Sequence, residues 1–359
     1  MNITRVSVSS LLAAALVVAG TADAATAAGH PDPLRPYLDK VVASGAAAAI
    51  AEVRRPGRTT RLAAGVAELG GPRRAPVDGR FRIGSVTKVM TATVLLQLVA
   101  EGRLKLDDPL SAHLPNVVEE AETVTIKHLL GHTSGVPEHT DEVIDENGML
   151  KEPGRTWRAQ ELVDLANKKP RQFPAGTEYA YTNTNYILLG MLIEKVTGRP
   201  YTREITDRII GPLKLTATRT PTPSTAIRGP HAHGYVTVDG TPRDVTRLNP
   251  TVAGAAGGVM STTADLNTFF RALLGGRLLR PAELALMKTA GVGGGYGLGL
   301  ELFPTSCGTA YGHGGGIPGY VTGSFHSADG RRQVTVSATP YQGNVVPALQ
   351  AVLEKGLCG

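Results

Sequence analysis

Segments that favour β-strands lie near both ends of the chain, and the long stretch between them favours helices. Near the start, residues 46–53 and 61–67 flank a turn over Arg54 to Arg58. Near the end, residues 320–326 and 332–338 are rich in β-branched residues and flank a turn at Gly330. This distribution predicts an α+β fold with one antiparallel sheet built from both chain ends and flanked by helices.

The middle of the chain places apolar residues at helical spacing, which predicts a mostly helical subdomain inserted into the sheet. The expected helices are 85–101, 159–167, 184–197, 264–274 and 281–288. The first of these has few polar interruptions, so we expect it to be a buried central element. The Gly-rich stretch 291–299 is expected to be a loop before a strand.

Shorter helices are expected at the two ends, over residues 31–42 and from Val346 to Lys355, with Gly356 ending the second. We expect a single domain over residues 28–359. Its sheet part would comprise residues 28–84 and about 255–359, and its helical part about 85–254.

The first 27 residues have the layout of a secretory signal peptide. Arg5 precedes an apolar run from Val6 to Gly20, and small residues follow. The run is shorter than the roughly 20 residues that span a bilayer as a helix. We therefore expect a secreted or cell-envelope protein with no stable membrane insertion, the alternative being an uncleaved anchor.

The net charge indicates which partners to expect, and the cysteines indicate which covalent link to expect. The net charge is +6, but the lysines and arginines are scattered, so we expect no nucleic-acid partner. Cys307 and Cys358 are the two cysteines of a chain expected in an oxidising compartment, which favours one disulfide, the alternative being two buried thiols. Closing that loop would stabilise the fold by roughly 4 kcal/mol.

Ser85 and Lys88 form a Ser-x-x-Lys pair that occurs once in the chain, at the start of the expected central helix. Residues three apart share a helical face, so the amine can reach the hydroxyl. A buried lysine favours its neutral form and can then accept the serine proton. The alternative is a capping serine beside a solvated lysine.

Two further motifs occur once each. Tyr181 and Asn183 form a Tyr-x-Asn before an apolar helix, where the phenol could relay protons and the amide could hold a substrate carbonyl. His313 and Gly315 form a His-x-Gly before the strand at Tyr320, and glycines there would let a substrate backbone approach. Each motif alone is more simply a loop feature.

Together, in this order, the three motifs resemble those of the penicillin-recognising serine hydrolases, which include serine beta-lactamases and D-alanyl-D-alanine carboxypeptidases. The chain is most similar to the secreted actinomycete carboxypeptidase branch, from about Pro33 to Cys358. The segments that carry this resemblance are 81–88 (FRIGSVTK), 129–135 (LLGHTSG), 179–190 (YAYTNTNYILLG), 296–300 (YGLGL) and 311–319 (YGHGGGIPG).

The resemblance implies a beta-lactamase/transpeptidase-like fold and a two-step acyl transfer. Ser85 would attack a carbonyl, Lys88 and Tyr181 would move protons, and His313 would tune the far side of the site. The backbone N–H groups of Ser85 and Gly316 would form the oxyanion hole. The resemblance implies no metal and no organic cofactor, and the expected substrates are cell-wall peptides, β-lactams or esters.

Three positions depart from the carboxypeptidase pattern. Where that branch holds a substrate carboxylate with hydroxyl residues and an arginine, this chain has Gly314, Gly316 and Glu301. A glutamate would repel a carboxylate. A D-amino-acid peptidase, an amidase or an esterase is therefore a candidate beside the carboxypeptidase, as are a class C-like beta-lactamase and a catalytically silent penicillin-binding module.

Other clusters favour simpler explanations. His231 and His233 lie in a Gly/Pro-rich loop without nearby acidic or sulfur ligands, so we expect no metal there. The acidic residues between Glu138 and Glu146 are expected to form a solvated loop, which would border the cleft. No serine lies in a Gly-x-Ser-x-Gly elbow, which argues against an α/β-hydrolase. We expect a monomer.

Overall fold

The computed structural model of the chain describes residues 32–359, and residues 34–359 form one compact unit. The expected signal peptide lies outside the described residues. Within residues 32–359, no helix is both long enough and apolar enough to cross a bilayer. The division into a sheet part and a helical part stays a prediction.

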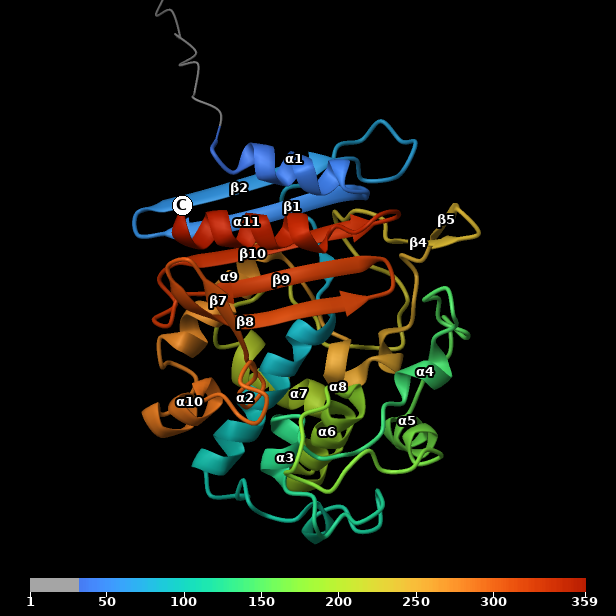
Figure 1. Cartoon of the computed structure of the whole chain (residues 1–359), viewed down its shortest axis with the longest axis vertical. Helices are drawn as coiled ribbons and strands as arrows, with labels where there is room; N and C mark the ends of the chain where they lie inside the picture. Colours follow the sequence, from blue (N-terminus) through green and yellow to red (C-terminus); the bar gives the residue numbers. More distant parts are fainter. Residues whose placement is uncertain (1–31) are drawn as a thin grey trace, which may run out of the picture. The chain divides into compact units, whose positions relative to one another are not determined.

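A six-stranded antiparallel sheet forms the framework, and both ends of the chain contribute to it (Figure 1). Its order is β2-β1-β10-β9-β8-β7. The first two strands are β1 (Ala46–Arg55) and β2 (Arg58–Gly65). The others are β7 (Glu301–Thr305), β8 (Gly308–Ile317), β9 (Tyr320–His326) and β10 (Gln333–Pro340). This confirms the expected α+β fold, with strands from the two chain ends, β1 and β10, paired inside the sheet.

Helices cover both faces of this sheet. On one face, α1 (Arg35–Ala43) packs on β1 and α11 (Val346–Cys358) packs on β9 and β10. On the other face, α9 (Thr263–Leu274) packs on β1, β9 and β10. Buried Val336 and Val352 belong to the apolar layer under α1 and α11. Removing these side chains from water supplies the hydrophobic term that holds the layers together.

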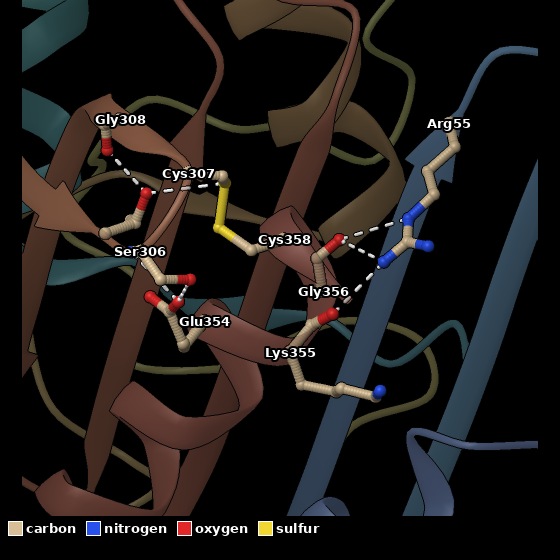
Figure 2. Close-up of a disulfide and its surroundings, with 9 residues drawn as sticks. Arg55, Ser306, Cys307, Gly308, Glu354, Lys355, Gly356 and Cys358 are labelled. Atoms are coloured by element: carbon tan, nitrogen blue, oxygen red, sulfur yellow. Dashed lines mark hydrogen bonds between the residues drawn. A yellow bond between two sulfur atoms is a disulfide. The ribbon is translucent and has the colours of Figure 1, made fainter.

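The closing helix is longer than the sequence predicts. It passes through Gly356 and ends at Cys358. A Cβ at Gly356 would collide with a methyl of Val334, so the glycine serves close packing of the helix on β10, where we expected a helix stop. Arg55 donates from β1 to the carbonyl oxygens of Lys355 and Gly356 at the helix end, and that of Lys355 also accepts the backbone N–H of Gly359 (Figure 2).

The expected disulfide joins Cys307 to Cys358, with 5.5 Å between their Cα atoms. It links the turn between β7 and β8 to the last helical turn (Figure 2). Beside it, the backbone N–H of Ser306 donates to Glu354 of α11 (3.1 Å). The bridge therefore fastens the outermost hairpin of the sheet to the helix that closes the chain.

A buried helix is the centre of the larger apolar core. The expected helix from Ser85 is divided into a 3-10 turn, η1 (Gly84–Val86), and α2 (Thr87–Ala100). Most of α2 is buried, as the sequence predicts. The α-helices around it and on the rest of this side are α3 (Ile126–Leu130), α4 (Thr140–Val143), α5 (Ala159–Ala166), α6 (Asn183–Thr197), α7 (Tyr201–Ile205), α8 (Gly254–Gly257) and α10 (Pro281–Lys288).

Small strands complete the described part of the chain. β3 (Phe81–Arg82) pairs with β6 (Met260–Ser261), and β4 (Tyr235–Val238) pairs with β5 (Thr241–Asp244). The β3–β6 pair holds the chain immediately before η1, which packs on β8 and β9 of the large sheet. Strand β8 was not expected from the sequence, because glycines at five of its ten positions weaken any strand signal.

Candidate active site

Ser85 lies where the 3-10 turn η1 packs against strand β8. Gly84 has φ +53°, and a Cβ there would come within 2.7–2.9 Å of the backbone of Gly316. A Cβ at Gly315 would collide with the carbonyl oxygen of Ile83. Glycines on both sides thus allow the turn and the strand to touch backbone to backbone. Ser85 is held beside the part of β8 that contains the His-x-Gly motif.

The amine of Lys88 lies next to the hydroxyl of Ser85, with 3.0 Å between Nζ and Oγ. The side chain is fully buried. Its two other contacts are the Oδ1 of Asn183 (2.7 Å) and the carbonyl oxygen of Ala256 in α8 (2.9 Å). Both are acceptors only, whereas the serine hydroxyl can also donate. A neutral amine satisfies all three contacts when its lone pair faces Ser85.

Burial lowers the pKa of Lys88 to about 7, and the carboxylates of Glu138 and Glu301 oppose the shift. Removal from water destabilises the ammonium form, and the nearby negative charges recover part of that cost. A substantial fraction of the amine is therefore unprotonated near neutral pH. Lys88 has both the contact and the protonation state that proton transfer from Ser85 requires.

The phenol of Tyr181 faces the same pair from the segment before α6. A hydrogen bond connects it to Ser85, and burial around its hydroxyl raises its pKa well above 10. The residue as a whole is 37% exposed. The Nζ of Lys88 lies 4.9 Å from the ring centroid. Because the phenol stays protonated at neutral pH, it can donate a proton to a group that forms between it and Ser85.

Asn183 connects Lys88 to Glu138, a residue that the sequence analysis assigned to a solvated loop. Both amide hydrogens have protein acceptors, Glu138 at 3.0 Å and the Thr140 hydroxyl at 3.1 Å. Glu138 also accepts from the backbone N–H of Asn183 (2.7 Å). A substrate carbonyl, the partner we predicted for this amide, would therefore have to displace one of these oxygens. Glu138 lies inside the site as a partner of Asn183.

His313 lies on β8 with its ring buried. Its Nε2 is 2.9 Å from the hydroxyl of Tyr296, and its Nδ1 contacts the carbonyl oxygen of Gly314. Burial lowers the pKa of His313, so the ring is neutral at neutral pH. With the Nδ1 proton directed at the carbonyl, Nε2 accepts from Tyr296. His313 meets the other motifs through the ring of Tyr181, at 6.3 Å between centroids.

Strand β8 presents an open edge at the site. Strand β7 pairs with it only as far as Glu301 opposite Gly312. Beyond that point the backbone N–H of Gly314 points to Glu301 Oε2 (3.0 Å). Alternate residues of a strand direct their N–H groups to the same side, so that of Gly316 points out at the same edge. A Cβ at Gly316 would meet nothing within 4 Å, which shows open space there.

His132 is a buried residue of the site that motif reasoning missed. Its ring stacks on that of Tyr181 at 4.2 Å and lies 4.9 Å from that of Tyr296. Its Nδ1 accepts from the backbone N–H of Thr182 (3.3 Å). Burial lowers the pKa of His132 well below 6.5, so the ring packs as a neutral group. It belongs to the LLGHTSG segment, which signalled family resemblance but no particular role.

The remaining candidates lie apart from this cluster. The rings of His231 and His233 stack at 5.7 Å, and His233 contacts Asp244. Among residues 32–359, no three His, Cys, Asp or Glu side chains gather in a way that could hold a metal ion. The structure thus brings together Ser85, Lys88, Tyr181, Asn183, His313 and Gly314–Gly316, with the disulfide outside the site.

Comparisons with known proteins find a family model that covers most of the described residues. Residues 34–345 match the family model described as Beta-lactamase. Penicillin-binding protein 4 of Amycolatopsis lactamdurans is 33% identical over 280 residues, which is 72% of this chain and 71% of that protein.

Two solved structures are similar over almost their full length. A D-stereospecific amidohydrolase from Streptomyces sp. superposes with a TM-score of 0.83 and 38% identity, covering 91% of this chain and 98% of the other. A D-amino acid amidase from Ochrobactrum anthropi SV3, complexed with L-phenylalanine, gives a TM-score of 0.79 and 28% identity, covering 90% and 97%.

Proposed function

The chain belongs to the beta-lactamase family of serine hydrolases, and from this premise we propose that it hydrolyses amide, peptide or ester bonds of D-amino-acid substrates through an acyl-enzyme. The observation that carries the proposal is the contact between Ser85 and Lys88. The amine is fully buried, its pKa is lowered to about 7, and its other partners are acceptors. This arrangement makes Lys88 the general base for Ser85.

In the acylation step, Ser85 Oγ forms a bond to the substrate carbonyl carbon while its proton passes to Lys88 Nζ. The N–H groups of Ser85 and Gly316 stabilise the negative oxygen of the tetrahedral intermediate. The bond to the leaving nitrogen or oxygen then breaks, and Tyr181 supplies the proton that the leaving group needs. Lys88 returns the proton to Tyr181, which restores the starting state.

In the deacylation step, water attacks the ester carbonyl of the acyl-enzyme. Its proton passes to the Lys88–Tyr181 pair and then to Ser85 as the product acid leaves. An amine in place of water would give transfer instead of hydrolysis. Neutral His313 supports this cycle indirectly, because it connects β8 to the hydroxyl of Tyr296 and packs against the ring of Tyr181.

Two features favour a D-amino-acid amidase or peptidase over a D-alanyl-D-alanine carboxypeptidase. One of the similar solved structures is a D-stereospecific amidohydrolase, and the other is a D-amino acid amidase. Glu301 lies beside His313 and Gly314, where a carboxylate on the substrate would meet a like charge.

The test is a panel of D- and L-phenylalanine amides, D-phenylalanine esters, and an N-acetylated D-alanyl-D-alanine peptide with a free C-terminus. We expect the D-amide to be cleaved faster than the L-amide and the N-acetylated peptide slowly. Ser85→Ala should lower the rate by at least about a thousandfold. Equal cleavage of the D- and L-amides, or activity that persists in Ser85→Ala, would refute the proposal.

Similarity to Penicillin-binding protein 4 favours a second activity, acylation by β-lactams. Incubation with a chromogenic cephalosporin separates the outcomes. A single burst of colour indicates a trapped acyl-enzyme, and sustained colour indicates a beta-lactamase. Absence of both, with no amide or ester hydrolysis, would identify a catalytically silent module.

We also propose that the protein is exported and monomeric. The disulfide supports an oxidising compartment, and residues 1–27 have the composition of a signal peptide. N-terminal sequencing of the protein released into the medium of an expressing bacterium tests export, and light scattering of the purified protein tests the mass. An intact N-terminus in the membrane fraction, or a multiple of the monomer mass, would contradict these assignments.

A further inference from the structure

Glu301 is a carboxylate at the edge of the active site, and it takes no part in the proposed mechanism. It is the first residue of β7, and its side chain is 34% exposed. One oxygen accepts the backbone N–H of Gly314, and the other lies 3.3 Å from Nδ1 of His313. Within residues 32–359, no lysine or arginine nitrogen lies within ion-pair distance of it. Its charge is therefore available to a ligand.

Glu301 lies beside Gly314 of β8, so it borders the reaction centre on the side of Gly316 that faces Gly312. A carboxylate oxygen of Glu301 accepts the hydrogen bond from the backbone N–H of Gly314. Along this edge of β8, that N–H is the next outward-pointing donor after the N–H of Gly316. A substrate held at Gly316 thus cannot continue its backbone pairing towards Gly312, where the carboxylate stands. Whichever part of the substrate extends in that direction meets a negative charge.

That part is the leaving group. Glu301 pairs with Tyr296 in an isolated β-bridge, and the Glu301 carboxylate and the Tyr296 hydroxyl both contact the ring of His313. The ring of Tyr181 lies 6.3 Å from that of His313, so the carboxylate and this phenol lie on the same side of the pocket. Tyr181 is the group that protonates the leaving atom in the proposed mechanism, and a proton donor must face the atom that it protonates. Glu301 and Tyr181 therefore both border the space that the leaving group occupies.

We propose that Glu301 forms a leaving-group subsite that binds a positively charged amine and disfavours a carboxylate. The inference rests on the proposed function and names the leaving groups that it prefers. The substrate class is a D-aminoacyl amide, peptide or ester whose leaving group carries an ammonium one or two carbons from the scissile bond. The chemical step is unchanged: the carbon–nitrogen or carbon–oxygen bond breaks, and the leaving atom takes its proton from Tyr181.

The competing explanation is that Glu301 only orients β8 and His313. Glu301→Gln separates the two explanations. The amide oxygen can still accept the N–H of Gly314 at the same size, but the charge is gone. A purely structural role predicts a uniform change in rate for all substrates. A charge-binding role predicts a change that depends on the leaving group.

The experiment compares three D-phenylalanyl amides with leaving amines of similar size and different charge. They are 1,2-diaminoethane (cationic), propylamine (neutral) and glycine (anionic). Wild type should show kcat/KM in the order cationic, neutral, anionic, with about a fivefold difference between neighbours, as for a partly exposed ion pair. Glu301→Gln should level the three values, and Glu301→Lys should reverse their order.

Esters of D-phenylalanine with 2-aminoethanol, propanol and glycolic acid repeat the comparison on a more reactive bond, so slow amide cleavage does not prevent it. Glu68→Gln, which removes an exposed carboxylate from the loop after β2, is the matched control and should keep the wild-type order. The same order in wild type and Glu301→Gln would overturn the subsite. Hydrolysis that does not depend on Ser85 would instead overturn the proposed function.

Discussion

At the scale of single residues, the chemistry depends on how one amine is surrounded. Lys88 exchanges water for three oxygens, from Ser85, Asn183 and Ala256. Two of these cannot donate, so the neutral form has one orientation in which every contact is satisfied. The burial that lowers its pKa also fixes its direction, and both effects favour proton transfer from the serine.

This environment predicts how the rate depends on pH. The base form of Lys88 is the active one, and its pKa is lowered to about 7. With an uncharged ester, kcat/KM should rise as pH rises through about 7 and level off above it, because the ammonium cannot accept a proton. Stopped-flow measurement of acylation between pH 5.5 and 9 checks this, with circular dichroism to show that the fold is intact throughout.

A flat profile, or one that falls across this range, would show that Lys88 is not the base. Lys88→Met is the companion variant, because it keeps an unbranched apolar stem of similar length and removes the amine. We expect it to lose at least about a hundredfold in acylation rate, the usual contribution of a positioned general base.

The sequence predicted some of these residues and not others. The pairing of Ser85 with Lys88 was predictable, because the two are three positions apart on one face. Asn183 and Ala256, the other partners of Lys88, are 95 and 168 positions away, and no local pattern connects them. The acidic neighbours of Glu138 predict a solvated residue, and its role as the partner of Asn183 depends on the tertiary fold.

At the scale of elements, the site is a contact between the turn η1 and the strand β8. Gly315 is the point of closest approach, since a Cβ there would collide with the carbonyl oxygen of Ile83 and lie 3.2 Å from the backbone nitrogen of Ser85. Ser85 can therefore lie this close to β8 only because Gly315 has no side chain.

Gly315→Ala should push η1 away from β8 and lower the acylation rate by about a hundredfold, the order of loss that a displacement of about 1 Å causes. Gly154→Ala is the control, because a Cβ at that loop position meets nothing within 4 Å. Acylation rates are measured beside melting curves. A near-normal rate in a fully folded Gly315→Ala protein would mean that the contact does not position Ser85.

The elements also show where sequence reasoning ends. The helix over 281–288 and the strand over 320–326 were predicted with their observed bounds, since periodicity and turn residues determine them. Strand β8 was not predicted, because glycines carry no strand preference and its conformation comes from pairing with β7 and β9. At Gly356 the usual stop signal was misleading, since the same residue type also serves close packing.

At the scale of the whole molecule, the disulfide connects the outer hairpin of the sheet to the last helix. Replacing both cysteines, Cys307→Ser with Cys358→Ser, should lower the free energy of unfolding by about 4 kcal/mol, from the entropy of a loop of 51 residues. Acylation by an uncharged ester should be almost unchanged, because Cys307 lies at the far end of β8 from Gly316.

Urea unfolding of the oxidised protein and the double variant measures this difference. A change below about 1 kcal/mol would show that the helix and hairpin hold together without the bridge. A large loss of activity in the folded variant would show that the far end of β8 affects the site.

The global arrangement was predictable because both chain ends carry strand-like sequence and one sheet can hold them together. Which edge of that sheet meets the helical core was not, since it depends on the pairing of β8 with β7 and on the glycines that admit η1. The site forms at this junction, from residues 85 to 316.

The claim that Ser85 is the nucleophile is tested most directly by the intact mass of the protein after brief exposure to benzylpenicillin and acid quenching. Wild type should gain the full mass of the drug, because opening of the β-lactam ring releases no fragment, and Ser85→Ala should gain nothing. An adduct that persists in Ser85→Ala would contradict the account.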